Sequence, residues 1–152
     1  MLPRYGFIVG GVRRTSSDLL VVHNPYTRQP LAEVCRAQAQ DVEDAVAAAV
    51  RAFASTRRLA SYERSQLLFE ASRRLAERCE DLARTVASEA GKPIRLARVE
   101  ARRTAEIFSV AAEEARRLGG EVIPLDWTEA TRGAIALNCR FPLGPIYGIT
   151  PF

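Results

Sequence analysis

The sequence predicts a mixed α/β fold with a short β-hairpin, three or four helices and then further strands. Three observations support this prediction. Short β-branched segments and turn residues occupy positions 7–37, apolar side chains recur at helical spacing over 41–118, and extended apolar segments return after 121. At 152 residues, 47% hydrophobic and 26% charged, the composition is that of one ordinary globular domain.

The beginning of the chain is expected to form the hairpin. Residues 7–14 and 19–23 are apolar and β-branched, and the polar stretch 15–18 between them predicts the turn. The tetrapeptide 24–27 (Asn-Pro-Tyr-Thr) predicts a second turn, because proline fixes one backbone angle and asparagine tolerates unusual ones. A further short strand is expected from Leu31 to Ala37.

Two amphipathic segments predict the first helices. Asp41 is a good N-cap for one helix, whose expected buried face consists of Val42, Ala45, Val46, Ala49, Val50 and Phe53. Ser61 is expected to cap the second helix, which has a break near Cys79 and ends at Gly91. The side chains expected to point inward from it include Leu67, Leu68, Ala71 and Leu75.

A third helix is predicted from Ile94 to Leu118, with Pro93 in its first turn and a glycine pair after its end. Its expected buried stripe consists of Ala101, Ala105, Phe108, Ala112 and Ala115. Beyond it, residues 122–125 are extended, 126–133 form a loop with the only tryptophan, and 134–141 and 146–149 are predicted strands.

The positive charge is almost entirely arginine. The net charge is +4 and the pI about 9.3, and Lys92 is the only lysine among the 22 basic residues. Many arginines come in adjacent pairs: 13–14, 57–58, 73–74, 102–103 and 116–117. A nucleic-acid groove would need interleaved aromatic side chains for base stacking, and these segments have few. Solvated helix faces with glutamate partners are therefore the favoured interpretation, and no nucleic-acid partner is expected.

The spacing of the cysteines and the single histidine does not match a metal-binding or catalytic motif. Cys35, Cys79 and Cys139 have no C-x-x-C spacing, so no metal site is expected, and His23 lies beside a predicted turn. No run of 18 apolar residues and no secretory signal occurs, so we expect a cytoplasmic protein without membrane contact.

Three motifs give the sequence a specific resemblance. Asn24-Pro25-Tyr26-Thr27 resembles the N-P-x-T motif of aldehyde dehydrogenases, and residues 89–93 (Glu-Ala-Gly-Lys-Pro) resemble the E-x-G-K-P motif of that family. Residues 140–152 resemble its R-x-P-x-G motif, which ends in a hydrophobic run and I-[ST]-P-[FW]. The motifs stand in the family's order, and the similarity covers the chain from about residue 7.

The resemblance implies the amino-terminal part of an aldehyde dehydrogenase, truncated before the catalytic domain. Residues 1–152 would then be a partial NAD(P)-binding domain of a longer parent protein. In the family, NAD or NADP accepts the hydride and a cysteine forms a thioester with the aldehyde. The resemblance assigns cofactor contacts to Ile149, Thr150, Pro151 and Phe152. It assigns no catalytic residue to this chain, and it implies asparagine as the next residue of the parent.

The segment around Arg103 is similar to the non-phosphorylating glyceraldehyde-3-phosphate and lactaldehyde dehydrogenase branch. There the corresponding arginine reaches the substrate, and a guanidinium suits a phosphate or polar aldehyde. The alternative is an exposed helix arginine paired with Glu100 or Glu106.

For the whole chain, the alternative to an enzyme fragment is a non-enzymatic helical interaction module. The family further implies a small-molecule aldehyde substrate and a homodimeric or homotetrameric parent.

Overall fold

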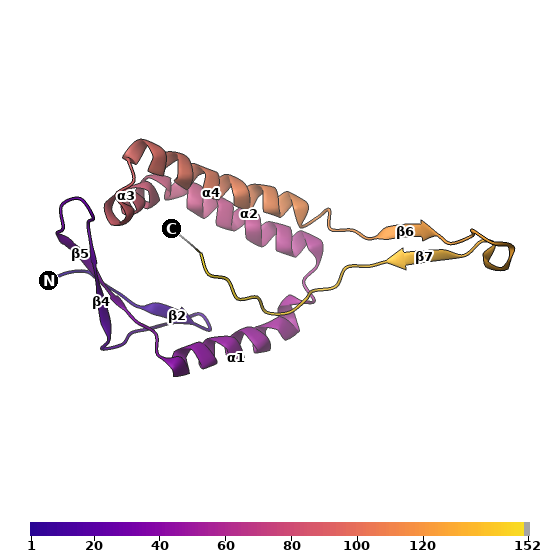
Figure 1. Ribbon diagram of the computed structural model, residues 1–152, viewed down its shortest axis with the longest axis horizontal. Coiled ribbons are helices and arrows are strands. Elements are labelled where there is room, and N and C mark those ends of the chain that lie inside the picture. The colour runs from indigo at the N-terminus through magenta and orange to yellow at the C-terminus, as the bar shows by residue number, and fades with distance from the viewer. Residues whose placement is uncertain (151–152) are drawn as a thin grey trace.

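The computed structural model describes residues 1–150 and confirms a mixed α/β fold (Figure 1). Strands β1 (Arg4–Tyr5) and β4 (Leu19–His23) both pair with β5 (Pro30–Cys35), β1 in parallel and β4 in antiparallel orientation. Two further sheets are antiparallel hairpins. One joins β2 (Phe7–Val9) to β3 (Val12–Arg14), and the other joins β6 (Glu121–Pro124) to β7 (Ile135–Asn138).

The prediction of one hairpin with its turn at 15–18 is wrong, because the chain forms two hairpins. Gly10 and Gly11 close β2 onto β3, and both have positive φ, 57° and 83°. A two-residue loop with positive φ at both positions matches the twist of the flanking strands, and glycine adopts it without steric cost. The turn predicted at 24–27 is confirmed and joins β4 to β5. Its Asn24 Oδ1 accepts hydrogen bonds from the backbone N–H groups of Tyr26 and Thr27, at 2.9 and 3.0 Å.

Four helices follow: α1 (Ala39–Thr56), α2 (Ser61–Glu77), α3 (Cys79–Ala90) and α4 (Ile94–Glu114). The break predicted near Cys79 and the stop at Gly91 are confirmed, Gly91 lying in the left-handed conformation with φ 66°. The predicted N-caps are wrong. Asp41 lies in the first turn of α1 and accepts a hydrogen bond from the Gln38 backbone N–H at 3.0 Å. Glu63 does the same for Ala60 at 2.7 Å.

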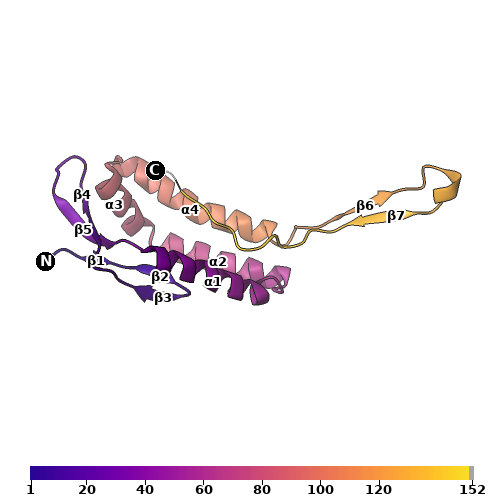
Figure 2. The same ribbon diagram turned by 60° about the horizontal axis from the view of Figure 1, so that its bottom comes forward.

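Helices α2, α3 and α4 form the packed layer of the molecule, and α2 runs beside α4 (Figures 1 and 2). The buried stripe of α4 is confirmed for its alanines: Ala101, Ala105, Ala112 and Ala115 are at most 7% exposed. Phe108 of the same stripe is only half-buried. Small side chains let the helices approach closely, and the Ser72 hydroxyl of α2 donates to the Ala105 carbonyl of α4 at 2.8 Å.

The apolar face predicted for α1 exists, but it is not buried. Val42, Val46 and Val50 are 52%, 55% and 57% exposed, because α1 packs mainly against β2, whereas α2, α3 and α4 pack extensively against one another. Leu67 of α2 is likewise 62% exposed instead of pointing inward. Helical periodicity identifies an apolar face, but burial also requires another element to cover that face.

The last quarter of the chain, after α4, leaves the helical layer. Strands β6 and β7 extend away from the helices as an arm, with the short helix η1 (Glu129–Thr131) at its tip (Figures 1 and 2). The chain then returns toward α1 without regular structure. The strand predicted at 146–149 is therefore absent, because a strand requires a backbone partner and no segment of residues 1–150 pairs with it. Over residues 1–150, no helix combines the length and apolar character needed to cross a membrane.

Candidate functional site

The returning segment and α1 form an apolar groove. We call it the α1 groove, a hollow of about 450 Å³. It is lined by three parts of the chain: residues 7–9 of β2, residues Ala37, Asp41, Val42, Ala45, Val46 and Ala49 in and before α1, and residues 145–147 of the returning segment. The side chains of Ile146 and Tyr147 are each 83% exposed, so the segment lies over the groove without filling it. The α1 groove is open to water and largely apolar.

Two carboxylates of α1 stand beside this groove and bind one arginine. Arg14 Nη1 lies 3.0 Å from Asp41 Oδ1 and 2.7 Å from Asp44 Oδ2. The backbone N–H of Gln38 and then Arg14 lower the pKa of Asp41 from its ordinary value. For Asp44, the hydrogen bond from Arg14 is the main cause of a lowered pKa. The cluster joins β3 to the first turn of α1 and thereby fixes one wall of the groove.

The residues expected to contact the cofactor lie just beyond this groove. Ile149 is 80% exposed and Thr150 is exposed, and neither belongs to a helix or strand. Pro151 and Phe152 lie outside the described residues. The role of these residues as cofactor contacts therefore stays a prediction.

Arg103 occupies the solvent-facing side of α4 and does not line the α1 groove. Of its two expected partners, Glu100 forms an ion pair with Lys92, and this pair lowers the pKa of Glu100. Within residues 1–150, no ion pair joins Arg103 to Glu100 or Glu106. The guanidinium is therefore exposed to solvent, and no hydrogen bond, ion pair or hollow found in residues 1–150 joins it to Ile149 or Thr150.

The thiols stay apart from one another. Cys35 is buried, Cys79 is half-buried and Cys139 is exposed, and no disulfide forms. Over residues 1–150, no three histidine, cysteine or acidic side chains come together as a potential metal site. In the β4–β5 ladder, Cys35 pairs with Leu19 and His23 pairs with Pro30, so this thiol and the imidazole lie at opposite ends of the strand pair.

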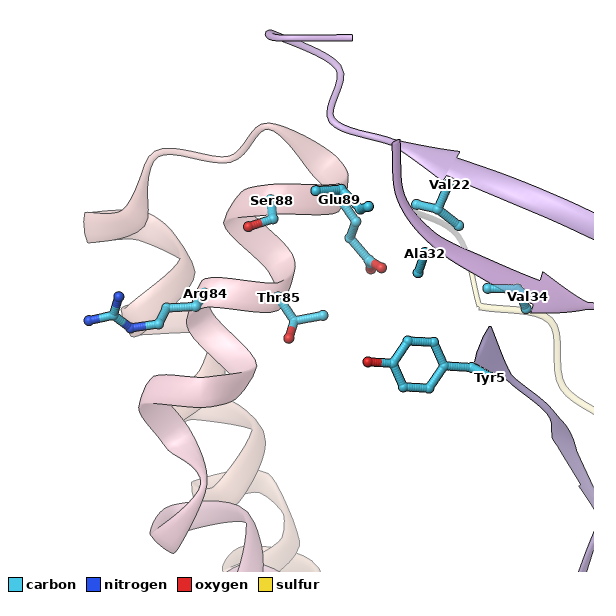
Figure 3. A pocket seen from close by; sticks show the side chains of 9 residues that line it. Tyr5, Val22, Ala32, Val34, Arg84, Thr85, Ser88 and Glu89 are labelled. Carbon is cyan, nitrogen blue, oxygen red and sulfur yellow. The ribbon is translucent and has the colours of Figure 1, made fainter. Parts of the chain in front are cut away.

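A second hollow, of about 470 Å³, separates the β1–β5–β4 sheet from α3 (Figure 3). Tyr5 directs its hydroxyl across the gap toward Thr85, and Glu89 enters from the end of α3 (Figure 3). Only Glu89 belongs to a motif recognised in the sequence. Tyr5 and Thr85 carried no sequence signal, because their proximity arises from the packing of distant elements.

Comparison with known proteins identifies the family of the chain. The sequence pattern of the aldehyde dehydrogenase family matches residues 12–152, and the chain belongs to that family. It is 38% identical to the 3-sulfolactaldehyde dehydrogenase of Priestia aryabhattai over 99% of this chain and 31% of that protein.

The fold agrees with this assignment. The structure of aldehyde dehydrogenase 21 from Physcomitrella patens, in complex with the reaction product succinate, matches with a TM-score of 0.85. The two chains are 36% identical, over 90% of this chain and 29% of that one. Lactaldehyde dehydrogenase from Escherichia coli matches with a TM-score of 0.77 and 31% identity, over 84% of this chain and 27% of that one. The chain thus spans somewhat under a third of the proteins it resembles.

Proposed function

We propose that the parent protein oxidises an aldehyde to a carboxylic acid with NAD or NADP. The observation that supports this is the family match over residues 12–152, combined with the fold similarity to aldehyde dehydrogenase 21. The reaction would proceed through a cysteine thioester whose thiol lies outside residues 1–152, because Cys35, Cys79 and Cys139 match no nucleophile motif. In this proposal residues 1–152 are part of the NAD(P)-binding domain and the catalytic domain is outside them.

The segment 149–152 would hold the dinucleotide, which supplies the hydride acceptor when bound. The side chain of Ile149 would give apolar contact, and the backbone around Thr150 would orient the ligand. The 80% exposure of Ile149 supports this assignment, because covering an exposed apolar side chain with a ligand removes it from water and makes the free energy of binding more favourable.

Titration of NADH into the parent protein tests this segment. We expect Ile149→Asp to weaken NADH binding, because a carboxylate would replace an apolar contact and repel the phosphates of the ligand. Leu143→Asp is the matched control, since Leu143 lies in the same returning segment and is 94% exposed. Equal effects of the two variants, or none, would remove Ile149 from the cofactor site.

The proposed substrate is a small aldehyde with an anionic or polar group, and Arg103 would bind that group. Two comparisons support this substrate class: one relative is a 3-sulfolactaldehyde dehydrogenase, and one similar structure holds the product succinate. Sulfonates and carboxylates both match the two parallel N–H donors of a guanidinium. The absence of an ion pair between Arg103 and its neighbours in residues 1–150 leaves those donors available.

We also propose that the parent is a cytoplasmic homodimer or homotetramer. The arm formed by β6 and β7 supports self-association, because Val122, Trp127 and Leu137 on it are 67%, 78% and 68% exposed. The mass of the parent in solution, measured by light scattering, tests this part.

The test of the activity is aldehyde-dependent reduction of NAD or NADP by the parent protein, with the acid product measured in parallel. Formation of one acid per reduced dinucleotide is expected. Failure to reduce either dinucleotide with any anionic, hydroxylated or simple aldehyde would contradict the proposal.

A further inference from the structure

A third hollow brings three arginine side chains together where α1 ends. Arg57 follows α1, Arg64 lies in the first turns of α2, and Arg140 follows β7. We call this the arginine hollow; its volume is about 570 Å³. The other lining residues are Phe53, Thr56, Leu118, Phe141, Pro142 and Gly144, so no acidic side chain lines it.

Among residues 1–150, no carboxylate forms an ion pair with any of these three arginines. Elsewhere arginines have carboxylate partners, as Arg14 has Asp44 and Arg98 has Glu80. Like charges that share one hollow repel each other. An anion bound between them would attract each guanidinium group and so offset this repulsion.

Two of the three guanidinium groups are held in place before any ligand arrives. The guanidinium carbon of Arg57 lies 5.5 Å from the centre of the Phe53 ring. Arg64 donates a hydrogen bond from Nη1 to the backbone carbonyl of Leu59. A group fixed in advance loses less conformational entropy on binding. Arg140 makes no side-chain hydrogen bond or ion pair within residues 1–150, so it is free to move onto a ligand.

We propose that the arginine hollow binds a free, phosphate-bearing small anion. Guanidinium groups bind phosphate oxygens through pairs of parallel hydrogen bonds, and three of them suit an anion with more than one negative charge. The hydroxyl of Thr56 adds a further donor on the same wall. The site differs from the proposed cofactor segment, because residues 149–150 do not line it, and it does not depend on the proposed activity.

The test is calorimetric titration of pyrophosphate into the parent protein at low ionic strength, with NADH present to occupy the dinucleotide site. The variants are Arg57→Gln and Arg140→Gln, which remove the charge but keep a side chain of similar length. Arg64 is left intact, because its bond to Leu59 also holds the connection between α1 and α2. Arg13→Gln is the control, since Arg13 is exposed, unpaired in residues 1–150 and outside the hollow.

We expect pyrophosphate to bind the parent, each hollow variant to bind it roughly tenfold more weakly, and the control to bind it unchanged. Thermal melting of each variant shows whether it is folded. Three results would overturn the proposal. They are no binding to the wild-type parent, binding that NADH abolishes, and equal binding to the wild type and both folded hollow variants.

Discussion

Gly91, between α3 and α4, lies against Pro25 in the turn between β4 and β5. A Cβ atom on Gly91 would lie 2.8 Å from Cγ of Pro25, closer than two carbon atoms can pack, and the φ of Gly91 is 66°. Two of the motifs that carry the family resemblance, residues 24–27 and 89–93, therefore meet in space. Glycine is required there both for its backbone conformation and for the close approach of the proline ring.

This contact predicts that Gly91→Ala destabilises the parent protein. An L-residue in the left-handed conformation loses about 1–2 kcal/mol, and the clash with Pro25 adds to this loss. Gly133→Ala is the matched control, because Gly133 has φ 77° but no atom within 4 Å of its would-be Cβ. Urea denaturation should show a larger loss for the Gly91 variant. Equal losses in the free energy of unfolding would mean that the close contact with Pro25 does not contribute to the destabilisation.

The sequence predicted the helices better than the strands, for a local reason. Helical boundaries depend on neighbouring residues, so the break near Cys79 and the stop at Gly91 could be read directly. Strand pairing depends on distant partners. The predicted hairpin differs from the observed β2–β3 hairpin, because the turn is Gly10-Gly11 and not the polar stretch 15–18. The strand expected at 146–149 needs a partner that residues 1–150 do not provide.

The cluster of Arg14 with Asp41 and Asp44 predicts a pH-dependent contribution to stability. Both carboxylates have lowered pKa values in the folded protein, so their stabilising effect is present above about pH 4, their unfolded pKa. It is lost as the pH falls through the folded pKa values. Arg14→Gln should act mainly through Asp44, because the Gln38 backbone N–H still lowers the pKa of Asp41.

Urea denaturation of the parent at a series of pH values measures this effect. The gap in stability between the wild type and Arg14→Gln should be largest near neutral pH and should close on acidification. Arg13→Gln, next to it in β3 and unpaired within residues 1–150, should follow the wild type at every pH. A gap for Arg14→Gln that stays constant or widens toward acid pH would refute the assignment. High salt should shrink the gap, because the pair is partly exposed.

Residues 1–152 expressed alone are expected to self-associate and to bind a hydrophobic dye. The apolar side chains of the α1 groove are accessible, with Val42 52%, Val46 55% and Ile146 83% exposed. Val46→Glu together with Ile146→Glu should reduce both dye fluorescence and association. A monodisperse, cooperatively melting monomer that binds no dye would show that these surfaces do not drive association.

Arg103→Leu in the parent should raise KM for anionic aldehydes roughly tenfold, because a charge-assisted hydrogen bond to the substrate is lost. Simple aliphatic aldehydes should be little affected. Arg102→Leu is the control, since Arg102 is the exposed neighbour on the same helix. Steady-state kinetics with both substrate classes decide the matter: similar changes for both, or none for either, would leave Arg103 as a surface residue.

The candidate site was predictable only where a motif marked it. The motif at 140–152 predicts a role for Ile149 and Thr150, and Glu89 of the motif at 89–93 lines a hollow. Tyr5 and Thr85, which face that hollow, and the three arginines around the third hollow carried no such mark. Arg57 and Arg140 are 83 positions apart, and only the return of the chain toward α1 brings them together.

We propose that the parent is an aldehyde dehydrogenase whose nucleophile lies outside residues 1–152. The most direct test compares aldehyde-dependent reduction of NAD and NADP by the wild-type parent and by the parent carrying Cys35→Ala, Cys79→Ala and Cys139→Ala. Residues 1–152 alone serve as the third sample. We expect activity in both parent proteins and none in residues 1–152 alone. An inactive wild-type parent, activity abolished in the folded triple variant, or cysteine-dependent activity in residues 1–152 alone would contradict it.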